Sequence, residues 1–297
     1  MSILNLIENN IDLDENQNFT AIIGINPSKG ARSPLLWNYV FEKNNINCRM
    51  HCFDVNEKNL EKLILNLTKN KFFLGGAIAV PYKESIFEIL YDNTNKETKN
   101  IGAINCLYRN DLGILCATNT DGEASLMSFQ EKYGFVGDKK VLVMGPGGAG
   151  KAVISYFLKS MTSSKNLYVS GRSENSMKFT QNLNCNYLKW NEFENHIAKF
   201  DILINCTSIG SSIDVENSPI SEKIISQIKE ETIVFDIIYD PSPSTLIKNL
   251  SNRKIRTIDG KKMNLLQASL AFDYCMKSIL GISNTFDIMK EKFEQLN

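Results

Sequence analysis

The sequence predicts an α/β protein built from two doubly wound domains, and two observations support this prediction. Short apolar runs alternate with amphipathic stretches along most of the chain, which is typical of parallel sheets covered by helices. Near the middle of the chain, a glycine-rich turn joins an apolar run to a helical stretch and marks the start of a second alternating unit. With 297 residues the chain is long enough for two moderate domains, each with its own core.

The first part of the chain alternates strands and helices and then ends in a hairpin. Three apolar runs predict strands of a parallel sheet, at residues 20–24, 49–55 and 72–80. Helices are predicted from Ser33-Pro34, with Ser33 as N-cap and Pro34 at the first helical position, at residues 60–67, and from Pro81 to Leu90. The runs at residues 104–108 and 114–118 flank a polar turn and predict a hairpin.

The second part begins with a predicted helix at residues 125–133. Strands are predicted at residues 141–144, 167–170, 201–205, 233–238 and 255–258, with helices between them. Two closing helices, at residues 263–280 and 286–295, have no further strand to cover in the second sheet, so we expect them to return to the first domain. The predicted domains are therefore residues 1–121 with 263–297, and residues 122–262.

Composition and charge exclude several classes of function. The 33 basic and 33 acidic side chains cancel, so there is no bulk attraction to nucleic acid or to anionic membranes. The N-terminal residues MSILNLIENN lack a basic segment, and no apolar run reaches membrane-spanning length. The seven cysteines are scattered and form no C-x-x-C pair, which indicates free thiols in a reducing compartment and no metal site. We therefore expect a soluble cytoplasmic protein.

A G-x-G-x-x-G motif follows the apolar run VLVM at residues 141–144 and precedes a helical pattern. Glycines at this point permit a tight turn and a close approach to a pyrophosphate, which then lies at the positive end of the helix. The strand–turn–helix context predicts a dinucleotide-binding Rossmann domain. Its phosphate-binding residues would be Gly145, Gly147, Gly148, Ala149 and Gly150.

Two other interpretations of this stretch stay open. One is an ordinary glycine-rich turn between a strand and a helix. The other is a P-loop, because Gly145 to Lys151 also spells G-x-x-x-x-G-K. A P-loop requires Ser or Thr at the next position to hold magnesium, and the chain has Ala152 there, which counts against a nucleoside triphosphatase.

The residues after the predicted strand at 167–170 indicate which dinucleotide is bound. Arg172 and Ser173 directly follow this strand, in the part of a dinucleotide fold where an acidic residue favours NAD and an arginine accommodates the 2′-phosphate of NADP. We therefore predict NADP rather than NAD. The alternative is that Ser173 is a helix N-cap beside a solvated Arg172, and the nearby Glu174 weakens the charge argument.

Five motifs, taken together, give the chain a resemblance to a known family. They are Pro27–Asn38 around Ser33-Pro34, Gly75–Lys83, Gly102–Asn105, Asn119–Gly122 and Gly260–Gln267. With the glycine loop and Asn205–Gly210, they make the chain similar to the shikimate dehydrogenase family from about Gly24 to the terminal helices. The first predicted domain resembles the family's substrate domain, and the second resembles its NADP domain.

The resemblance implies NADPH-dependent reduction of 3-dehydroshikimate to shikimate, with the family's catalytic lysine falling on Lys83 and its aspartate on Asp121. Physical chemistry agrees with this, because hydride delivery to a ketone builds negative charge on oxygen and requires a proton donor beside it. The alternatives are that Lys83 is a solvated residue in the first turn of a helix and that Asp121 is a turn former before Gly122.

The resemblance also implies further site residues. Asn105 and Gln267 match amide ligands of substrate hydroxyls, and Tyr239 matches a tyrosine near the substrate and nicotinamide; otherwise these are a turn asparagine, a surface glutamine and a strand-end aromatic. Ser33 would hold the substrate carboxylate, Arg32 could pair with it, and Thr207 and Gly260 would join the cofactor site.

Three positions depart from the family pattern. Ala31, Ala77 and Ala79 stand where polar residues usually bind substrate, and Trp37 adds bulk near the same loop. Loss of such hydrogen bonds weakens carboxylate binding, at roughly 1.5–3 kcal/mol for each charge-assisted bond. The chain could therefore act on a different substrate, or be a non-catalytic module that binds a metabolite or NADP. We expect a small-molecule ligand and a monomer or homodimer.

Overall fold

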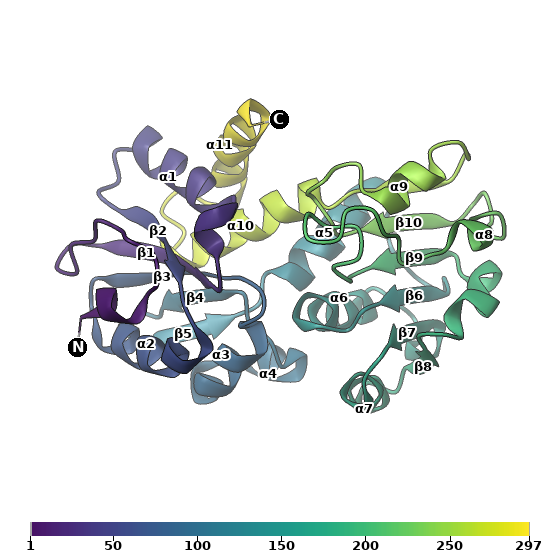
Figure 1. Ribbon diagram of the computed structural model, residues 1–297, viewed down its shortest axis with the longest axis horizontal. Helices are drawn as coiled ribbons and strands as arrows, with labels where there is room; N and C mark the ends of the chain where they lie inside the picture. The colour runs from purple at the N-terminus through teal and green to yellow at the C-terminus, as the bar shows by residue number, and fades with distance from the viewer. Residues whose placement is uncertain (1, 297) are drawn as a thin grey trace. The chain divides into compact units, whose positions relative to one another are not determined.

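The computed structural model describes residues 2–296, which form two compact units (Figure 1). Unit 1 comprises the chain up to Thr120 together with the segment from Leu265 onward, and unit 2 comprises Asp121–Asn264. Each unit is built around a sheet with helices packed on it, so the α/β fold class is confirmed.

The described part of unit 1 contains a five-stranded mixed sheet in the order β2-β1-β3-β4-β5. Its strands are β1 (Phe19–Gly24), β2 (Arg49–Asp54), β3 (Phe73–Ile78), β4 (Cys106–Arg109) and β5 (Leu115–Thr118). The first three strands are parallel, whereas β4 is antiparallel to both β3 and β5. The predicted hairpin is therefore present as β4–β5.

Helices cover both faces of this sheet. One face packs against α2 (Glu57–Lys69), α3 (Lys83–Ile89) and the 3-10 helix η1 (Ile3–Leu6), and α4 (Lys96–Ile101) precedes β4. The other face packs against α1 (Ser33–Lys43), α11 (Ile282–Gln295) and the part of α10 (Lys261–Cys275) that lies in unit 1. Because α1 and α11 lie side by side (Figure 1), the predicted return of the closing helices to the first domain is confirmed.

An aromatic cluster holds the returning segment in place. Trp37 packs edge-on against Phe272 of α10 with ring centroids 5.1 Å apart, and Phe41 lies 5.2 Å from Phe272. Trp37 is fully buried. It therefore belongs to the core, rather than adding bulk to the loop before α1 as the sequence suggested.

The start of α1 differs from the sequence prediction. Ser33 is the first helical residue, and Arg32 occupies the N-cap position. The prediction of Ser33 as N-cap was wrong because the helix begins one residue earlier, which moves Pro34 to its second residue.

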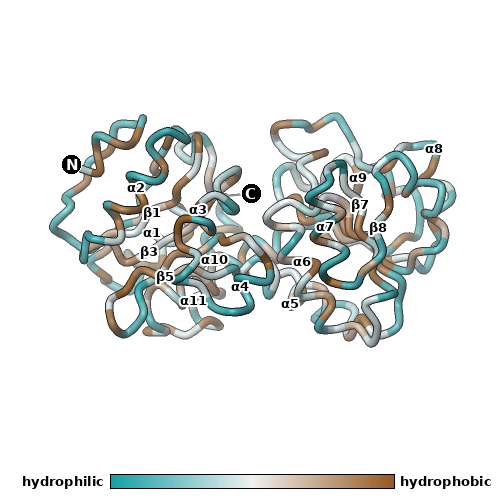
Figure 2. Tube along the Cα trace, turned by 90° about the horizontal axis from the view of Figure 1, so that it is seen from below, coloured by the Kyte–Doolittle hydropathy of each residue, from teal (hydrophilic) through white to brown (hydrophobic). Residues whose placement is uncertain are grey.

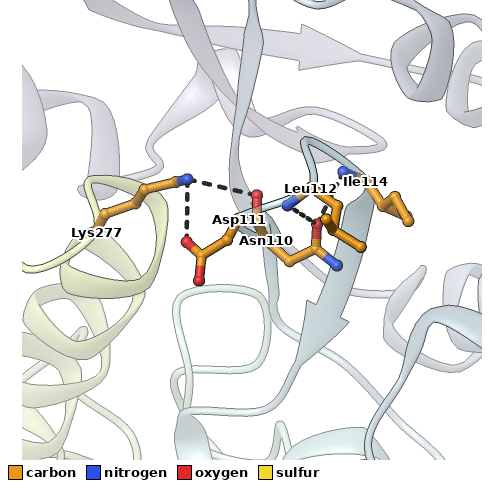
Figure 3. A network of polar contacts seen from close by, with 5 residues as sticks. All are labelled: Asn110, Asp111, Leu112, Ile114 and Lys277. Atoms are coloured by element: carbon orange, nitrogen blue, oxygen red, sulfur yellow. Dashed lines mark hydrogen bonds and ion pairs between the residues drawn. The ribbon is translucent and has the colours of Figure 1, made fainter.

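The end of α10 also lies earlier than predicted. Lys277 and Ser278 have φ angles of +50° and +56°, so the helix cannot continue to residue 280. The Lys277 ammonium instead reaches the β4–β5 turn, 3.3 Å from Asp111 Oδ1, and donates to the Asn110 carbonyl oxygen (Figure 3). The Asn110 side-chain oxygen accepts the N–H groups of Leu112 and Ile114, which fixes that turn.

The described part of unit 2 contains a six-stranded parallel sheet in the order β11-β10-β9-β6-β7-β8. The strands are β6 (Val141–Met144), β7 (Leu167–Gly171), β8 (Asn186–Lys189), β9 (Ile202–Asn205), β10 (Ile233–Asp236) and β11 (Arg256–Ile258). Counted from β6, this is the strand order of dinucleotide-binding folds, so the predicted Rossmann topology is confirmed. Figure 2 shows hydrophobic segments along the strands in the middle of this unit.

The helices of unit 2 lie between its strands, apart from the first, which precedes β6. They are α5 (Asp121–Tyr133), α6 (Gly148–Lys159), α7 (Glu174–Asn182), α8 (Glu222–Ile225), α9 (Thr245–Leu250) and the 3-10 helix η5 (Phe193–Lys199). The α5 helix begins four residues before the predicted Ser125, because Asp121 and Gly122 already belong to it. Phe129 of α5 packs edge-on against Phe157 of α6, with centroids 5.3 Å apart.

Two further observations concern the apolar runs and the cysteines of the sequence. Among residues 2–296, no helix is long and apolar enough to cross a membrane. All seven cysteines lie in the described chain and are free thiols, with Cys106 and Cys275 buried and the other five partly buried.

Gly76 is expected to be essential to the sheet of unit 1. Its φ is +149°, and a Cβ atom there would lie 1.9 Å from the carbonyl oxygen of Ala21 on β1. We expect Gly76→Ala to lower the free energy of unfolding by about 3 kcal/mol or more in urea denaturation, from steric overlap and backbone strain. Gly113→Ala has a positive φ but no described neighbour within 4 Å, so it should cost only about 1 kcal/mol. Equal losses in the two variants would contradict this account.

Candidate active site

The sheet of unit 1 has a topological switch point at the carboxyl ends of β1 and β3. The chain leaves β1 toward β2 on one side and returns to β3 on the other, and ligands of α/β sheets bind outside such a point. Two loops flank it, residues 25–32 after β1 and 79–82 after β3. They lie close together, since a Cβ atom on Gly24 would be 3.0 Å from the Ala79 methyl group.

Lys83 is the first residue of α3 and directly follows the second of these loops. Its backbone carbonyl oxygen accepts the N–H of Ile104 at 2.9 Å. The preceding residue, Tyr82, is buried and donates its hydroxyl to the Val55 carbonyl oxygen at 2.7 Å. The backbone of Lys83 is therefore fixed by its own hydrogen bond to Ile104 and by that of the neighbouring Tyr82. Its half-buried side chain lies next to the segment that carries Asn105.

The structure brings Asn105 and Gln267 together, and a third residue joins them. The Asn105 amide nitrogen donates to Gln267 Oε1 at 3.2 Å and to Thr120 Oγ1 at 2.9 Å. The Asn105 side-chain oxygen accepts the N–H of Thr120 at 2.7 Å, and the Thr120 hydroxyl lies 3.0 Å from the Gln267 backbone oxygen. Sequence reasoning missed Thr120, although it stands in the motif Asn119–Gly122.

This amide cluster lies at the same edge of the sheet as Lys83. Asn105 precedes the antiparallel strand β4, and its backbone oxygen accepts the N–H of Ile78 at the carboxyl end of β3. Asn105 is 2% exposed, whereas Gln267 is half-buried, so the Gln267 end of the cluster lies nearer the surface. Amide groups that both donate and accept suit a ligand rich in hydroxyl groups.

The other predicted substrate residues lie at the start of α1. Ser33 is half-buried, and the Arg32 guanidinium lies over the ring of Phe293 in α11, 4.9 Å from its centroid. The three alanines that depart from the family pattern, Ala31, Ala77 and Ala79, all pack with the apolar cluster around Trp37 and Phe272.

In unit 2 the glycine loop lies between β6 and α6. Gly145 has a φ of +87°, and a Cβ atom there would lie 2.6 Å from the Thr207 methyl group. A Cβ atom on Gly150 would lie 2.1 Å from the Gly145 carbonyl oxygen, so these two glycines are required by close packing.

Gly147 has a different environment. It is the N-cap of α6, and a Cβ atom there would have no described atom within 4 Å. Gly148 and Ala149 begin the helix, so backbone N–H groups of its first turn, which have no intrahelical acceptors, lie next to open space. This arrangement fits the pyrophosphate of a dinucleotide.

Thr207 is held against the glycine loop by a buried polar network. Its N–H and its hydroxyl both donate to the Asn205 side-chain oxygen, at 3.0 and 2.7 Å. The Asn205 amide nitrogen donates to Asp236 Oδ1 at 3.0 Å, and the hydroxyl of Ser244 donates to the other carboxylate oxygen. Asp236 therefore fixes Thr207, and with it the packing of Gly145, through Asn205.

Burial changes the titration of groups in this network. Burial raises the pKa of Asp236 from 3.8 to about 6, although hydrogen bonds from Ser244, the Ile238 N–H and Asn205 act in the opposite direction. The pKa of the neighbouring Cys206 thiol is raised well above its usual value by burial and by the charges of Asp236 and Asp121. Sequence reasoning missed Asp236 because a single aspartate at a strand end carries no motif of its own.

The predicted 2′-phosphate residues lie between β7 and α7. Arg172 is exposed, and its guanidinium lies 5.9 Å from the ring centroid of Trp190, which follows β8. Ser173 is the N-cap of α7 and accepts the N–H of Ser176 at 3.2 Å. Ser173 thus caps α7, and Trp190 is a neighbour of Arg172 that no sequence pattern indicated.

Asp121 is the first residue of α5 and is 5% exposed. The next residue, Gly122, lets the start of α5 approach α6, since a Cβ atom there would lie 2.6 Å from the Ala152 carbonyl oxygen. Ala152 is buried at this contact, where a P-loop would need a hydroxyl group toward its metal ion. Lys83 and Asp121 lie in different units, and each is fixed within its own.

The last two predicted residues follow β10 and β11. Tyr239 is half-buried, three residues beyond β10. The Gly260 N–H donates to the Ile238 carbonyl oxygen at 2.9 Å, and a Cβ atom on Gly260 would lie 2.0 Å from the Ile237 carbonyl oxygen. Among the described residues, no group of three or more His, Cys, Asp or Glu side chains could hold a metal ion.

Two family models match this chain. The shikimate dehydrogenase substrate binding domain matches residues 22–107, and shikimate / quinate 5-dehydrogenase matches residues 128–262. The chain belongs to the shikimate dehydrogenase family. It is thus an oxidoreductase of the shikimate / quinate dehydrogenase family with a Rossmann domain in unit 2.

Individual relatives agree with this family. A shikimate dehydrogenase (NADP+) of Caldanaerobacter subterraneus subsp. tengcongensis is 33% identical over 267 residues, covering 88% of this chain and 92% of that protein. A crystal structure of a shikimate dehydrogenase in complex with NADP+ has a TM-score of 0.79 at 25% identity, covering 95% of this chain and 97% of the other. A 5-ketofructose reductase of Gluconobacter sp. has a TM-score of 0.74 at 20% identity, covering 94% and 98%, and shares the fold.

The raised pKa of Asp236 predicts a specific pH dependence of stability. Because the folded state holds the proton more tightly than the unfolded state, the stabilisation from the neutral carboxyl is complete below pH 3.8 and is lost as pH rises through about 6. Relative to Asp236→Asn, the wild-type free energy of unfolding should fall by about 2 kcal/mol between roughly pH 4 and pH 7.5, measured in urea. Asp240→Asn, at an exposed carboxylate, should keep the wild-type dependence. Parallel curves for wild type and Asp236→Asn would contradict the assignment.

Gly147→Ala is expected to weaken NADPH binding with little effect on the free energy of unfolding. Because there is space for a methyl group at this position, we expect a stability change of less than about 1 kcal/mol. The same methyl group would block the close approach of a pyrophosphate, so the Kd for NADPH should rise at least about tenfold, measured by calorimetry. Gly134→Ala, at the end of α5, is the control and should leave the Kd unchanged. Unchanged binding in Gly147→Ala would exclude this loop as the phosphate site.

Proposed function

We propose that this protein reduces 3-dehydroshikimate to shikimate, or a closely related cyclic keto acid to its hydroxy acid, with NADPH and with Lys83 and Asp121 as the catalytic pair. The observation that carries the proposal is the cluster of Asn105, Thr120 and Gln267 beside the start of α3, where Lys83 stands. The names of the relatives, which include NADP+, support the reaction class and the cofactor.

The proposed chemistry assigns a separate task to each side chain. Bound NADPH supplies the hydride for the ketone carbon. The Lys83 ammonium neutralises the charge that develops on the ketone oxygen and supplies its proton. Asp121 holds that ammonium in the orientation in which it donates. Asn105 and Gln267 bind the ring hydroxyls, which fixes the ring before transfer.

The remaining predicted residues are proposed to bind the ends of the two ligands. Ser33 and Arg32 would hold the substrate carboxylate, and Tyr239 would lie near the substrate and nicotinamide. The pyrophosphate would lie on Gly145, Gly147, Gly148, Ala149 and Gly150, with Arg172 and Ser173 at the 2′-phosphate and Thr207 and Gly260 completing the site. Residues 1–121 with 263–297 would then be the substrate and catalytic domain, and residues 122–262 the NADP domain. We propose a monomer or homodimer that acts on a small molecule in the cytoplasm.

A second candidate is a dehydrogenase of the same family with a different ketone substrate. It is favoured by Ala31, Ala77 and Ala79, whose methyl groups pack into the apolar cluster and offer no hydrogen bonds to a carboxylate.

The experiment that tests the proposal follows NADPH oxidation with 3-dehydroshikimate and 3-dehydroquinate. Turnover of either supports the proposed substrate class, and a preference for NADPH over NADH supports the role of Arg172. Turnover of neither, with NADPH still bound, would refute the substrate assignment and favour the second candidate or a non-catalytic binding module.

Lys83 and Asp121 should behave as one catalytic unit. We expect Lys83→Ala to lower kcat by about a thousandfold, because general acid catalysis contributes roughly 10²- to 10⁴-fold. If Asp121 acts through Lys83, Asp121→Asn should have little further effect in the Lys83→Ala background. Lys58→Ala, at an exposed lysine in the first turn of α2, should keep the wild-type kcat. Full activity in Lys83→Ala, or strictly additive losses in the double variant, would contradict the pair.

A further inference from the structure

The loop that leads to Arg32 and Ser33 begins with a short 3-10 helix, η2 (Pro27–Lys29). Among the described residues, its own N-cap, Asn26, makes no side-chain capping hydrogen bond. The first N–H groups of such a helix need acceptors from elsewhere. Since only three residues separate Lys29 from Ser33, whatever fixes η2 also fixes the start of α1.

Asp54, the last residue of β2, supplies the missing cap. Its Oδ1 accepts the N–H of Ser28 at 2.9 Å, and its Oδ2 accepts the Ser28 hydroxyl. Both carboxylate oxygens thus bind one residue of η2, which fixes the orientation of the loop as well as its position. Asp54 is 5% exposed, and a buried carboxylate is tolerated only when it is hydrogen-bonded in this way.

Asp54 is itself held rigidly. Its backbone N–H donates to the Asn9 side-chain oxygen at 2.8 Å, and the Asn9 amide nitrogen donates to the Cys52 carbonyl oxygen at 3.0 Å. The clamp on Ser28 therefore rests on a strand fixed by the sheet and by the N-terminal segment.

The next residue, Val55, reaches the other loop of the switch point. Its N–H donates to the Gly24 carbonyl oxygen at 2.8 Å, and its own carbonyl oxygen accepts the hydroxyl of Tyr82 at 2.7 Å. Tyr82 directly precedes Lys83. The carboxyl end of β2 thus holds both the loop that carries Ser33 and the turn that precedes Lys83.

We propose that Asp54 is a positioning residue for the substrate: through Ser28 it holds the loop from η2 to Ser33 in the conformation that binds the substrate carboxylate. This inference rests on the proposed function, because it assigns the loop to substrate rather than to cofactor. Asp54 does not touch the substrate itself. Loss of the clamp therefore affects substrate affinity, whereas proton transfer at Lys83 and NADPH binding continue.

The test compares Asp54→Ala, Ser28→Ala and Asp54→Asn with a matched control. The control is Asn38→Ala, because the Asn38 side chain also makes two hydrogen bonds to β2, with the N–H and carbonyl oxygen of Met50, at 2.7 and 3.1 Å. Ser28→Ala removes only a hydroxyl from an exposed residue, so it tests the clamp even if Asp54→Ala folds poorly.

Hydrogen–deuterium exchange tests the clamp without any substrate. Asp54→Ala and Ser28→Ala should raise exchange in residues 25–33 by about tenfold or more, because hydrogen bonds that hold the loop are lost. Asn38→Ala should leave exchange in this segment unchanged. Unchanged exchange in Asp54→Ala would overturn the proposal.

Steady-state kinetics test the consequence for substrate. Asp54→Ala and Ser28→Ala should raise KM for 3-dehydroshikimate about tenfold and leave kcat and KM for NADPH within about twofold. Asp54→Asn should lie close to wild type, since an amide retains an acceptor for the Ser28 N–H and can donate to its hydroxyl. Raised exchange with an unchanged KM, or losses confined to kcat, would also overturn the proposal.

The two readouts also separate this inference from the proposed function. If wild type reduces no candidate ketone, the proposed function fails, and the exchange data still decide whether Asp54 holds the loop. If wild type is active and the clamp variants are indistinguishable from it, the inference fails alone.

Discussion

The amide of Asn105 is buried, and its hydrogen bonds depend on a residue 162 positions away, Gln267. Buried polar groups must be hydrogen-bonded, and Thr120 and Gln267 are the partners that α5's preceding loop and α10 bring to it. Unit 1 is therefore completed only when the closing helices return to it. The same contacts that close the unit place three polar side chains beside the start of α3, so the candidate site depends on the return of α10.

In both units the candidate ligand-binding groups lie at the carboxyl ends of parallel strands, but different contacts hold the loops there. Parallel strands point their carboxyl ends to one edge, and the loops that follow them gather the groups that bind ligands. In unit 2 the loop after β6 is shaped by glycines, because backbone atoms must lie against Thr207 and leave space at Gly147. In unit 1 the loops after β1 and β3 are held by hydrogen bonds to the end of β2. Ser28 donates to the Asp54 carboxylate, and the Tyr82 hydroxyl donates to the Val55 carbonyl oxygen.

The sequence indicates much of this fold because its strongest signals are local. The apolar run before Gly145, the glycine spacing and the alternation of strands with helices all act over a few residues, and the structure confirms them. The strand β8 was missed because it has only four residues, none of them fully buried, and polar Asn186 and Lys189 at its ends leave no apolar run. The start of α1 was displaced by one residue, since propensity alone does not locate a helix end to that accuracy.

The parts of the candidate site that sequence did not indicate all depend on long-range partners. Asp54 accepts a hydrogen bond from Ser28, and Arg172 lies near Trp190. Asp236 positions Thr207 through its hydrogen bond with Asn205. None of these pairs is recognisable from spacing, because the chain between the partners forms whole elements. Trp37 illustrates the reverse case, in which a residue assigned to a loop by its sequence position belongs to the core.

The central claim, that this protein transfers a hydride rather than only binding a dinucleotide, is tested most directly with NADPH deuterated at the transferable position of the nicotinamide. After incubation with 3-dehydroshikimate, mass spectrometry of the product should show one deuterium on the new carbinol carbon, and Lys83→Ala should form this product far more slowly. Binding of NADPH with no deuterium in any product of the cyclic ketones offered would contradict the account.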